Sequence, residues 1–243
     1  MSGHSKWSTI KRKKEKTDAQ RAKIFTKLSR ELMVAVKEGG ADPESNSKLK
    51  DIIAKAKSNN VPNDNIDRVI KKASGSGNSA HFEQVRYEGF GPGGIAVIAD
   101  TLTDNRNRTA SNLRHYFDKF GAGLGTSGSV VWLFEHKGVV VVSKDGTPED
   151  KLMEDALECG ASDFLTDDEE VYVVHTNPNE FSKVLGDLER CGCRFVSAEK
   201  EMVPSTWVSL TNEDDIKSMN KLIDALEDDD DVQDIWHNWE NEQ

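Results

Sequence analysis

The sequence predicts an α+β protein of three domains: an N-terminal three-helix domain, a discontinuous mixed α/β middle domain, and an inserted ferredoxin-like β-α-β-β-α-β domain. Three observations predict this fold class. Apolar residues recur at helical spacing through the first part of the chain, short β-rich runs separated by glycines begin near residue 80, and strands and helices alternate after residue 138. The predicted boundaries are 1–17 for a flexible basic arm, 18–79 for the helical domain, 80–137 plus 204–243 for the middle domain, and 138–203 for the inserted domain.

The helical domain is predicted from three amphipathic segments. Asp18 is placed to cap a first helix, which Gly39-Gly40 ends. Asp42-Pro43 supplies a cap and an early proline for a second helix, and Pro62-Asn63 starts a third, shorter one. Residues 74–79 are serine- and glycine-rich, which is typical of a linker.

The rest of the chain predicts short strands and helices in alternation. The predicted strands are 84–87, 95–99, 130–134, 139–142, 164–165, 171–174, 194–203 and 232–236, and the predicted helices are 106–119, two that follow Pro148 and Pro178, and 213–226. The last helix and strand have too little apolar surface to fold alone. We therefore expect them to return to the middle domain, which makes that domain discontinuous.

Length and composition restrict the class of protein. The chain has 243 residues, of which 36% are hydrophobic, and no stretch approaches the roughly 18 to 20 apolar residues of a membrane span. It also lacks the apolar segment of a signal peptide. Three cysteines are an odd and sparse set that suits free thiols in a reducing compartment. We expect a cytoplasmic, monomeric protein with no membrane partner.

The charge distribution points to the N-terminal region as the functional end. The net charge is −11, but residues 1–75 hold 18 Lys/Arg and 9 Asp/Glu, a net of +9. The remaining 168 residues hold 14 and 34, a net of −20. A basic end joined to an acidic body can bind a polyanion while the body stays soluble.

The arm combines flexible cations with one aromatic ring, which can neutralise phosphates and stack on an unpaired base. A solvated charged tail is the alternative, because basic tails are common. Candidate contacts extend from the arm into the first helix: His4, Lys6, Trp7, Lys11, Arg12, Lys13, Lys14, Arg21, Lys23 and Lys27.

A second candidate surface lies on the predicted helix 106–119. Arg108, Asn112, His115 and Lys119 fall at i, i+4, i+7 and i+11, so they share one face, and Arg106 opens the same helix. The predicted packing side chains lie opposite. The polar face can bind nucleic acid, and an ordinary solvated face fits the pattern equally well.

Other motifs do not support catalysis or a cofactor. Gly121–Gly128 precedes a strand and lacks the Gly-Lys-Ser/Thr of a phosphate-binding loop. Cys191 and Cys193, with Cys159, do not complete a zinc ligand set, and Asp228–Asp231 has no EF-hand spacing and predicts a solvated turn. We expect no enzyme activity, no catalytic residues, no metal, no cofactor and no small-molecule substrate.

Four motifs together resemble the YebC family over essentially the whole chain. They are Gly3-His4-Ser5-Lys6-Trp7, Asp18 with Arg21 and Lys23-Ile24-Phe25, Gly89-Phe90-Gly91-Pro92-Gly93-Gly94, and Leu102-Thr103-Asp104-Asn105-Arg106-Asn107-Arg108-Thr109. The resemblance implies three domains, a cytoplasmic setting and no known catalytic reaction. Cys191-Gly192-Cys193 and residues 235–239 depart from the family pattern.

The resemblance leaves two targets open. Members are commonly described as DNA-binding transcriptional regulators, whereas mitochondrial relatives are translational activators and bacterial members are linked to ribosomes stalled on proline-rich sequences. The sequence shows no recognition helix of a helix-turn-helix motif, and a flexible arm with an aromatic suits irregular RNA. We therefore favour a non-enzymatic regulator that binds rRNA or the ribosome, with DNA-binding transcriptional regulation as the alternative. A protein-interaction adaptor that acts through the acidic body is a third hypothesis.

Overall fold

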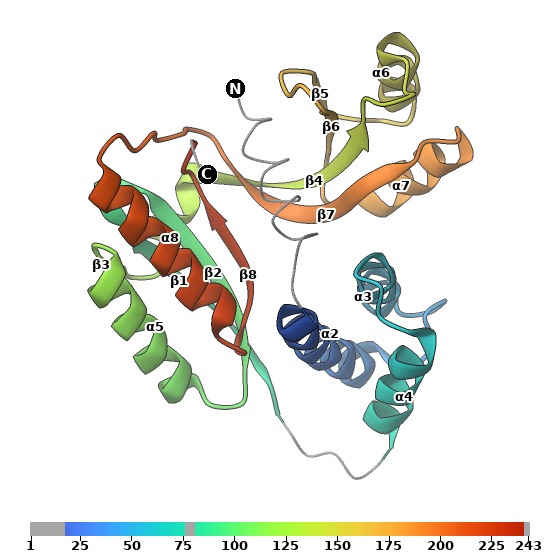
Figure 1. Ribbon diagram of the computed structural model, residues 1–243. Coiled ribbons are helices and arrows are strands. Elements are labelled where there is room, and N and C mark those ends of the chain that lie inside the picture. The colour runs from blue at the N-terminus through green and yellow to red at the C-terminus, as the bar shows by residue number, and fades with distance from the viewer. Residues whose placement is uncertain (1–17, 76–80, 241–243) are drawn as a thin grey trace. The chain divides into compact units, whose positions relative to one another are not determined.

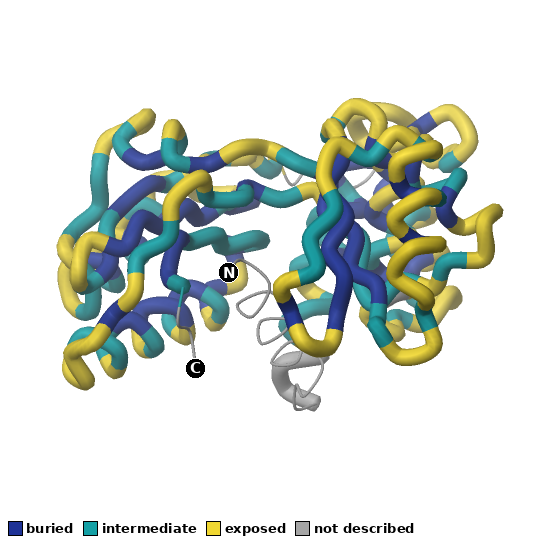
Figure 2. The backbone as a smooth tube through the Cα atoms, turned by 90° about the horizontal axis from the view of Figure 1, so that it is seen from above, coloured by how far each residue is buried: buried dark blue, intermediate teal, exposed yellow. Residues whose placement is uncertain are grey.

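The computed structural model describes residues 18–75 and 81–240 (Figure 1). The chain divides into two compact units. One unit runs to Val131 and includes Thr211–His237, and the other contains Trp132–Leu210 and the residues from Asn238. Helices in both units carry buried and exposed residues in alternation along their length (Figure 2). The α+β fold class predicted from the sequence is confirmed.

Three helices form the N-terminal part of the first unit: α2 (Asp18–Gly39), α3 (Ser47–Ser58) and α4 (Asn63–Ser74). Their apolar faces meet in one core that includes Leu28, Leu32, Leu49 and Ile66. The spacing of these residues puts them on one side of each helix, so burial of that side holds the three helices together.

The start of α3 differs from the predicted start at Asp42-Pro43. Asn46 caps the helix: its side-chain oxygen accepts a hydrogen bond from Leu49 N at 3.0 Å. The side-chain nitrogen Nδ2 of Asn46 donates hydrogen bonds to the carbonyl oxygens of Ala35 and Gly40, each at 2.8 Å. Asp42 closes a tight turn instead, accepting from Ser45 Oγ at 3.0 Å. The sequence pattern did not reveal this cap, because two partners that orient the Asn46 side chain lie in α2 and directly after it.

The same unit contains a four-stranded antiparallel sheet of order β3-β1-β2-β8. Its elements are β1 (Glu83–Phe90), a 3₁₀ turn η1 (Pro92–Gly94), β2 (Ala96–Thr103), α5 (Arg106–Phe120), β3 (Gly123–Leu124), α8 (Glu213–Asp228) and β8 (Val232–His237). β2 is the most buried strand of this sheet and pairs with β1 and with the C-terminal β8. Figure 1 shows α5 and α8 side by side along this sheet.

The predicted strand 130–134 is wrong. Val131–Leu133 forms a 3₁₀ turn, η2, and the next strand begins at Phe134. The buried carboxylate of Glu88 accepts hydrogen bonds from the backbone N–H groups of Val130 and Val131, each at 2.8 Å. Amides bonded to a side chain are not available to a strand ladder, so the segment turns.

The second unit has a β-α-β-β-α-β order. Its elements are β4 (Phe134–Ser143), α6 (Glu149–Glu158), β5 (Asp163–Leu165), β6 (Val171–Thr176), α7 (Phe181–Arg190) and β7 (Phe195–Pro204). The strands pair antiparallel in the order β5-β6-β4-β7, which is the split β-α-β arrangement. Val140 and Val142 of β4 face α6 and α7, whereas Val139 and Val141 face a second apolar cluster on the opposite side.

Candidate nucleic-acid interface

The predicted contacts of the basic arm lie outside the described residues. These are His4, Lys6, Trp7, Lys11, Arg12, Lys13 and Lys14, and they stay predictions from sequence. Arg21 lies in α2, but its side chain is outside the description as well. The described candidate surfaces therefore lie on α2 from Lys23 onward, α3, α4 and α5.

Lys23, Lys27 and Arg30 form one side of α2, at i, i+4 and i+7, and are called here the α2 cationic face. Each of them contacts the end of α8 or the turn after it. Lys23 Nζ lies 2.7 Å from Asp228 Oδ1, and Lys27 Nζ donates to the carbonyl oxygen of Glu227 at 2.8 Å. Arg30 Nη1 donates to Asp230 O at 2.6 Å and to Asp231 Oδ1 at 2.9 Å.

The partner of this face is the acidic turn, residues Asp228–Asp231, which the sequence predicts to be solvated. That prediction is wrong for two of its four carboxylates, since Asp229 and Asp231 are buried. The turn follows the C-terminal end of α8, where the helix dipole already disfavours negative charge. Its stability therefore depends on the cations that other helices bring to it.

Asp231 is the centre of the acidic turn. Its Oδ2 accepts from Arg108 Nη2 at 2.7 Å, from Thr109 Oγ1 at 2.7 Å and from Thr103 Oγ1 at 3.2 Å, while Oδ1 is bonded to Arg30. Burial alone would raise the pKa of Asp231, but hydrogen bonds from Arg108 and Thr109 and the charge of Arg108 outweigh it and lower the pKa below its ordinary value. The carboxylate is thus held ionised inside the unit.

The predicted basic stripe of α5 is divided by the same turn. Arg108 bonds to Asp231, and Asn112 Nδ2 and Tyr116 Oη both bond to Asp229 Oδ2 at 3.2 Å. His115 and Lys119 are exposed, as is Arg106 at the start of the helix. Helical spacing correctly placed four residues on one surface. It could not reveal that Asp229 and Asp231 bond to two of them, Asn112 and Arg108.

The structure also presents cations that the sequence analysis did not single out. Lys57 of α3 and Arg68, Lys71 and Lys72 of α4 are exposed, and their side chains make no ion pair with any residue that the structure describes. By contrast, Lys48 and Lys55 of α3 are paired with Glu38 and Glu31. The signal that could have found the four was the excess positive charge of residues 1–75, resolved residue by residue.

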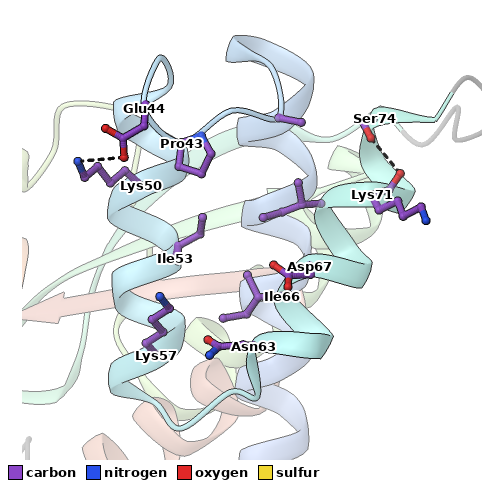
Figure 3. A pocket seen from close by; sticks show the side chains of 12 residues that line it. Pro43, Glu44, Lys50, Ile53, Lys57, Asn63, Ile66, Asp67, Lys71 and Ser74 are labelled. Carbon is purple, nitrogen blue, oxygen red and sulfur yellow. Dashed lines mark hydrogen bonds and ion pairs between the residues drawn. The ribbon is translucent and has the colours of Figure 1, made fainter.

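A groove of about 720 Å³ lies between α3 and α4, and two of these unpaired lysines line it. Figure 3 shows Lys57 projecting from α3 and Lys71 from α4, with Ile53 and Ile66 between the helices. Glu44 and Asp67 also line it, and Glu44 pairs with Lys50 at 3.7 Å. The groove therefore has an apolar floor, and the lysines at its rim make no ion pair with the described residues.

The last amide of the glycine-rich segment Gly121–Gly128, and two amides that follow it, are bonded to a side chain of the protein itself. Glu88 accepts from Gly128 N at 2.7 Å as well as from Val130 and Val131. A carboxylate thus fills the position that a phosphate could take at these amides. The segment is held by β1, through the pairing of β3 and the side chain of Glu88.

The described residues contain neither a metal-binding cluster nor a helix able to cross a membrane. No group of three or more His, Cys, Asp or Glu side chains there could hold a metal ion. None of the described helices combines the length and apolar character needed to cross a membrane. Cys159, Cys191 and Cys193 are free thiols, and burial is the main cause that raises the pKa of Cys159 to about 11.

Comparison with known protein families assigns the two parts of the chain separately. Residues 5–76 match the TACO1/YebC protein N-terminal domain, and residues 82–239 match the TACO1/YebC second and third domain. The chain belongs to the TACO1/YebC family. This confirms the resemblance that the sequence motifs indicated.

Full-length relatives carry one description. A protein of Acetivibrio thermocellus is 57% identical over 243 residues, with 100% of both chains covered. A Finegoldia magna protein is 53% identical over 242 residues, again with 100% of both covered, and a Clostridioides difficile protein is 56% identical over 231 residues, covering 95% of this chain and 96% of its own. Each is described as a "probable transcriptional regulatory protein".

A solved structure supports the fold. The crystal structure of a conserved hypothetical protein from Aquifex aeolicus is 44% identical in sequence and superimposes with a TM-score of 0.82. The match covers 93% of this chain and 92% of that one. The α+β architecture is therefore shared within the family.

Proposed function

We propose that this TACO1/YebC family protein is a non-enzymatic regulator of gene expression that binds RNA, most directly as a ribosome-associated translation factor. The observation that carries the proposal is the set of cations Lys57, Arg68, Lys71 and Lys72 on α3 and α4, whose side chains make no ion pair within the part of the chain that the structure describes. They lie in a region of net charge +9, whereas the rest of the chain carries −20. Phosphate backbones are bound by such cations through release of counterions.

The groove favours single-stranded over duplex nucleic acid. Its isoleucines offer an apolar surface to unstacked bases, and the rim lysines are placed for the backbone. Three helices of 22, 12 and 12 residues pack around one core here, and the rim is formed by side chains of two of them. A double-helical target read by one recognition helix would not use a groove between two helices in this way.

The first test is a titration of the full chain with single-stranded RNA at low salt. We expect Lys71→Ala with Lys72→Ala to weaken binding by about tenfold or more, since two phosphate contacts are removed. The matched control is Lys217→Ala with Lys221→Ala, which removes the same charge from exposed positions on α8. Equal losses from both pairs would mean that the α4 lysines have no special role and would refute the proposed site.

The ribosome part of the proposal has its own test. The native protein is sedimented through a gradient of ribosomes, and we expect it in ribosomal fractions at low salt and in the free fraction after a salt increase. Absence from every ribosomal fraction at low salt would leave RNA binding standing and reject the ribosome as the target.

DNA-binding transcriptional regulation is the second candidate, favoured by the description that the relatives carry. It requires that one promoter be bound at least about 10³-fold more tightly than random duplex. We expect no such preference for this chain. A competition between promoter fragments and random duplex decides between the two.

A further inference from the structure

The α2 cationic face is partly closed by the protein's own acidic turn. The three cations lie seven residue steps apart from first to last, so they extend along about 10 Å of the helix axis, since an α-helix rises about 1.5 Å per residue. In this structure they donate hydrogen bonds to oxygens: the carboxylates of Asp228 and Asp231 and the carbonyls of Glu227 and Asp230. A row of negatively polarised oxygens is also what a phosphodiester backbone presents.

The contacts of the turn fall into two groups of different strength. Asp231 is fixed to its own sheet and to α5 by Thr103, Thr109 and Arg108, and its carbonyl accepts from Leu102 N at 2.7 Å. Arg30 of α2 belongs to this group, because the Asp231 side chain that it meets is only 5% exposed. The link from α2 to Asp228 is exposed, because the side chains of Lys23 and Asp228 are 39% and 68% accessible. Exposed ion pairs contribute little and weaken with salt, so this link can exchange while the base of the turn stays in place.

We infer that Lys23, at the exposed end of the α2 cationic face, is a second phosphate-binding position for RNA, which Asp228 of the acidic turn occupies in the free protein and which RNA takes over in competition with it. The inference rests on the proposed function and adds to it a surface and an intramolecular competitor. It explains why Lys23 and Lys27, in the most basic part of the chain, face an acidic segment some 200 residues away.

The decisive variant is Asp228→Asn, which keeps the shape of the side chain and removes the charge that Lys23 meets. RNA affinity of the full chain is measured with the same single-stranded RNA at low salt. We expect binding to tighten by about two- to fivefold, the range that follows from an exposed ion pair. The control is Asp214→Asn, which changes the net charge equally at the opposite end of α8.

A double-mutant cycle separates competition for Lys23 from a general change in charge. Lys23→Ala alone should weaken binding, and Asp228→Asn should give no gain in the Lys23→Ala background. Because both side chains are exposed, all variants should fold, which thermal unfolding verifies.

The outcomes distinguish the two proposals. If wild type binds RNA and Asp228→Asn equals Asp214→Asn, the competing turn is refuted and the proposed function stands. If Asp228→Asn gains affinity equally with and without Lys23, the gain is long-range electrostatics and the inference is again refuted. If no variant binds RNA, both proposals fail. A gain that requires Lys23 supports the inference.

Discussion

Glu88 is a buried carboxylate, 4% exposed, whose oxygens accept three backbone hydrogen bonds from residues 40 to 43 positions later in the chain. Burial alone would raise the pKa of Glu88, but the three N–H donors, with a contribution from Arg86, outweigh it and lower the pKa. One side chain thus sets the course of the loop that leads into β4.

Glu88→Gln tests this role. The glutamine amide group brings N–H donors toward backbone N–H groups, so at least one of the three donors is left without an acceptor. We expect unfolding free energy to fall by about 1 to 3 kcal/mol, measured by chemical denaturation at pH 7. Glu83→Gln, at the exposed start of the same strand, should change it by less than about 0.5 kcal/mol.

The pH dependence of this difference follows from the lowered pKa. The folded state holds the Glu88 carboxylate ionised more strongly than the unfolded chain does, so the stabilisation is complete above the ordinary carboxyl pKa. It is lost as pH falls through the lowered value in the folded state. The gap between wild type and Glu88→Gln should therefore narrow on acidification, and a gap that widened would contradict the assignment.

At the scale of elements, helices were predicted well because their signals are local. Apolar spacing and end signals predicted α2, α4, α5 and α8 to within two residues of their observed ends where ends were given. The start of α3 failed because Asn46 bonds to Ala35 and Gly40, contacts that exist only once α2 and α3 pack. Residues 130–134 failed for the same reason, since Glu88 lies far away in sequence.

The candidate site was predictable only in part. Charge counting identified the basic region, and helical spacing put Arg108 and Asn112 on one surface. The turn that covers them lies near the C-terminal end of the chain. A sequence pattern does not predict that residues 108 and 231 are in contact. Lys57 and Lys71 lie in sequence near lysines that form ion pairs. That their own side chains form none with the described residues is visible only once the helices are packed.

Two glycines differ in how much space their surroundings leave for a side chain. A Cβ at Gly89 of β1 would lie 2.6 Å from Phe117 Cε1 and 2.9 Å from the carbonyl oxygen of Gly123. Gly89→Ala should therefore destabilise the unit by about 1 to 3 kcal/mol, because it overpacks α5 against the sheet. A Cβ at Gly186 inside α7 meets nothing within 4 Å, so Gly186→Ala should raise stability by about 0.5 to 1 kcal/mol. Thermal unfolding of both variants checks the two signs.

At the scale of the whole molecule, charge is separated along the chain. The sequence pI of about 5.1 means that the protein carries a net negative charge at neutral pH, yet residues 1–75 carry a net charge of +9. A polyanion repels such a chain at long range but attracts its basic end. The affinity should therefore fall steeply with salt concentration, and the protein should bind with its basic end toward the polyanion. The acidic turn acts locally, because its Asp228 carboxylate competes with RNA phosphates for Lys23.

The salt dependence also separates the two kinds of contact expected of the arm. For single-stranded RNA the slope of log affinity against log salt is about −0.7 for each phosphate neutralised, so Lys11→Ala should make the slope shallower by roughly that amount. Trp7→Ala removes no charge and should leave the slope unchanged, while it lowers affinity at every salt concentration by about 1 to 3 kcal/mol if the ring stacks on a base. Binding curves at four or more salt concentrations give both quantities. A Trp7→Ala variant with wild-type affinity would remove stacking from the mechanism and leave the arm a purely electrostatic contact.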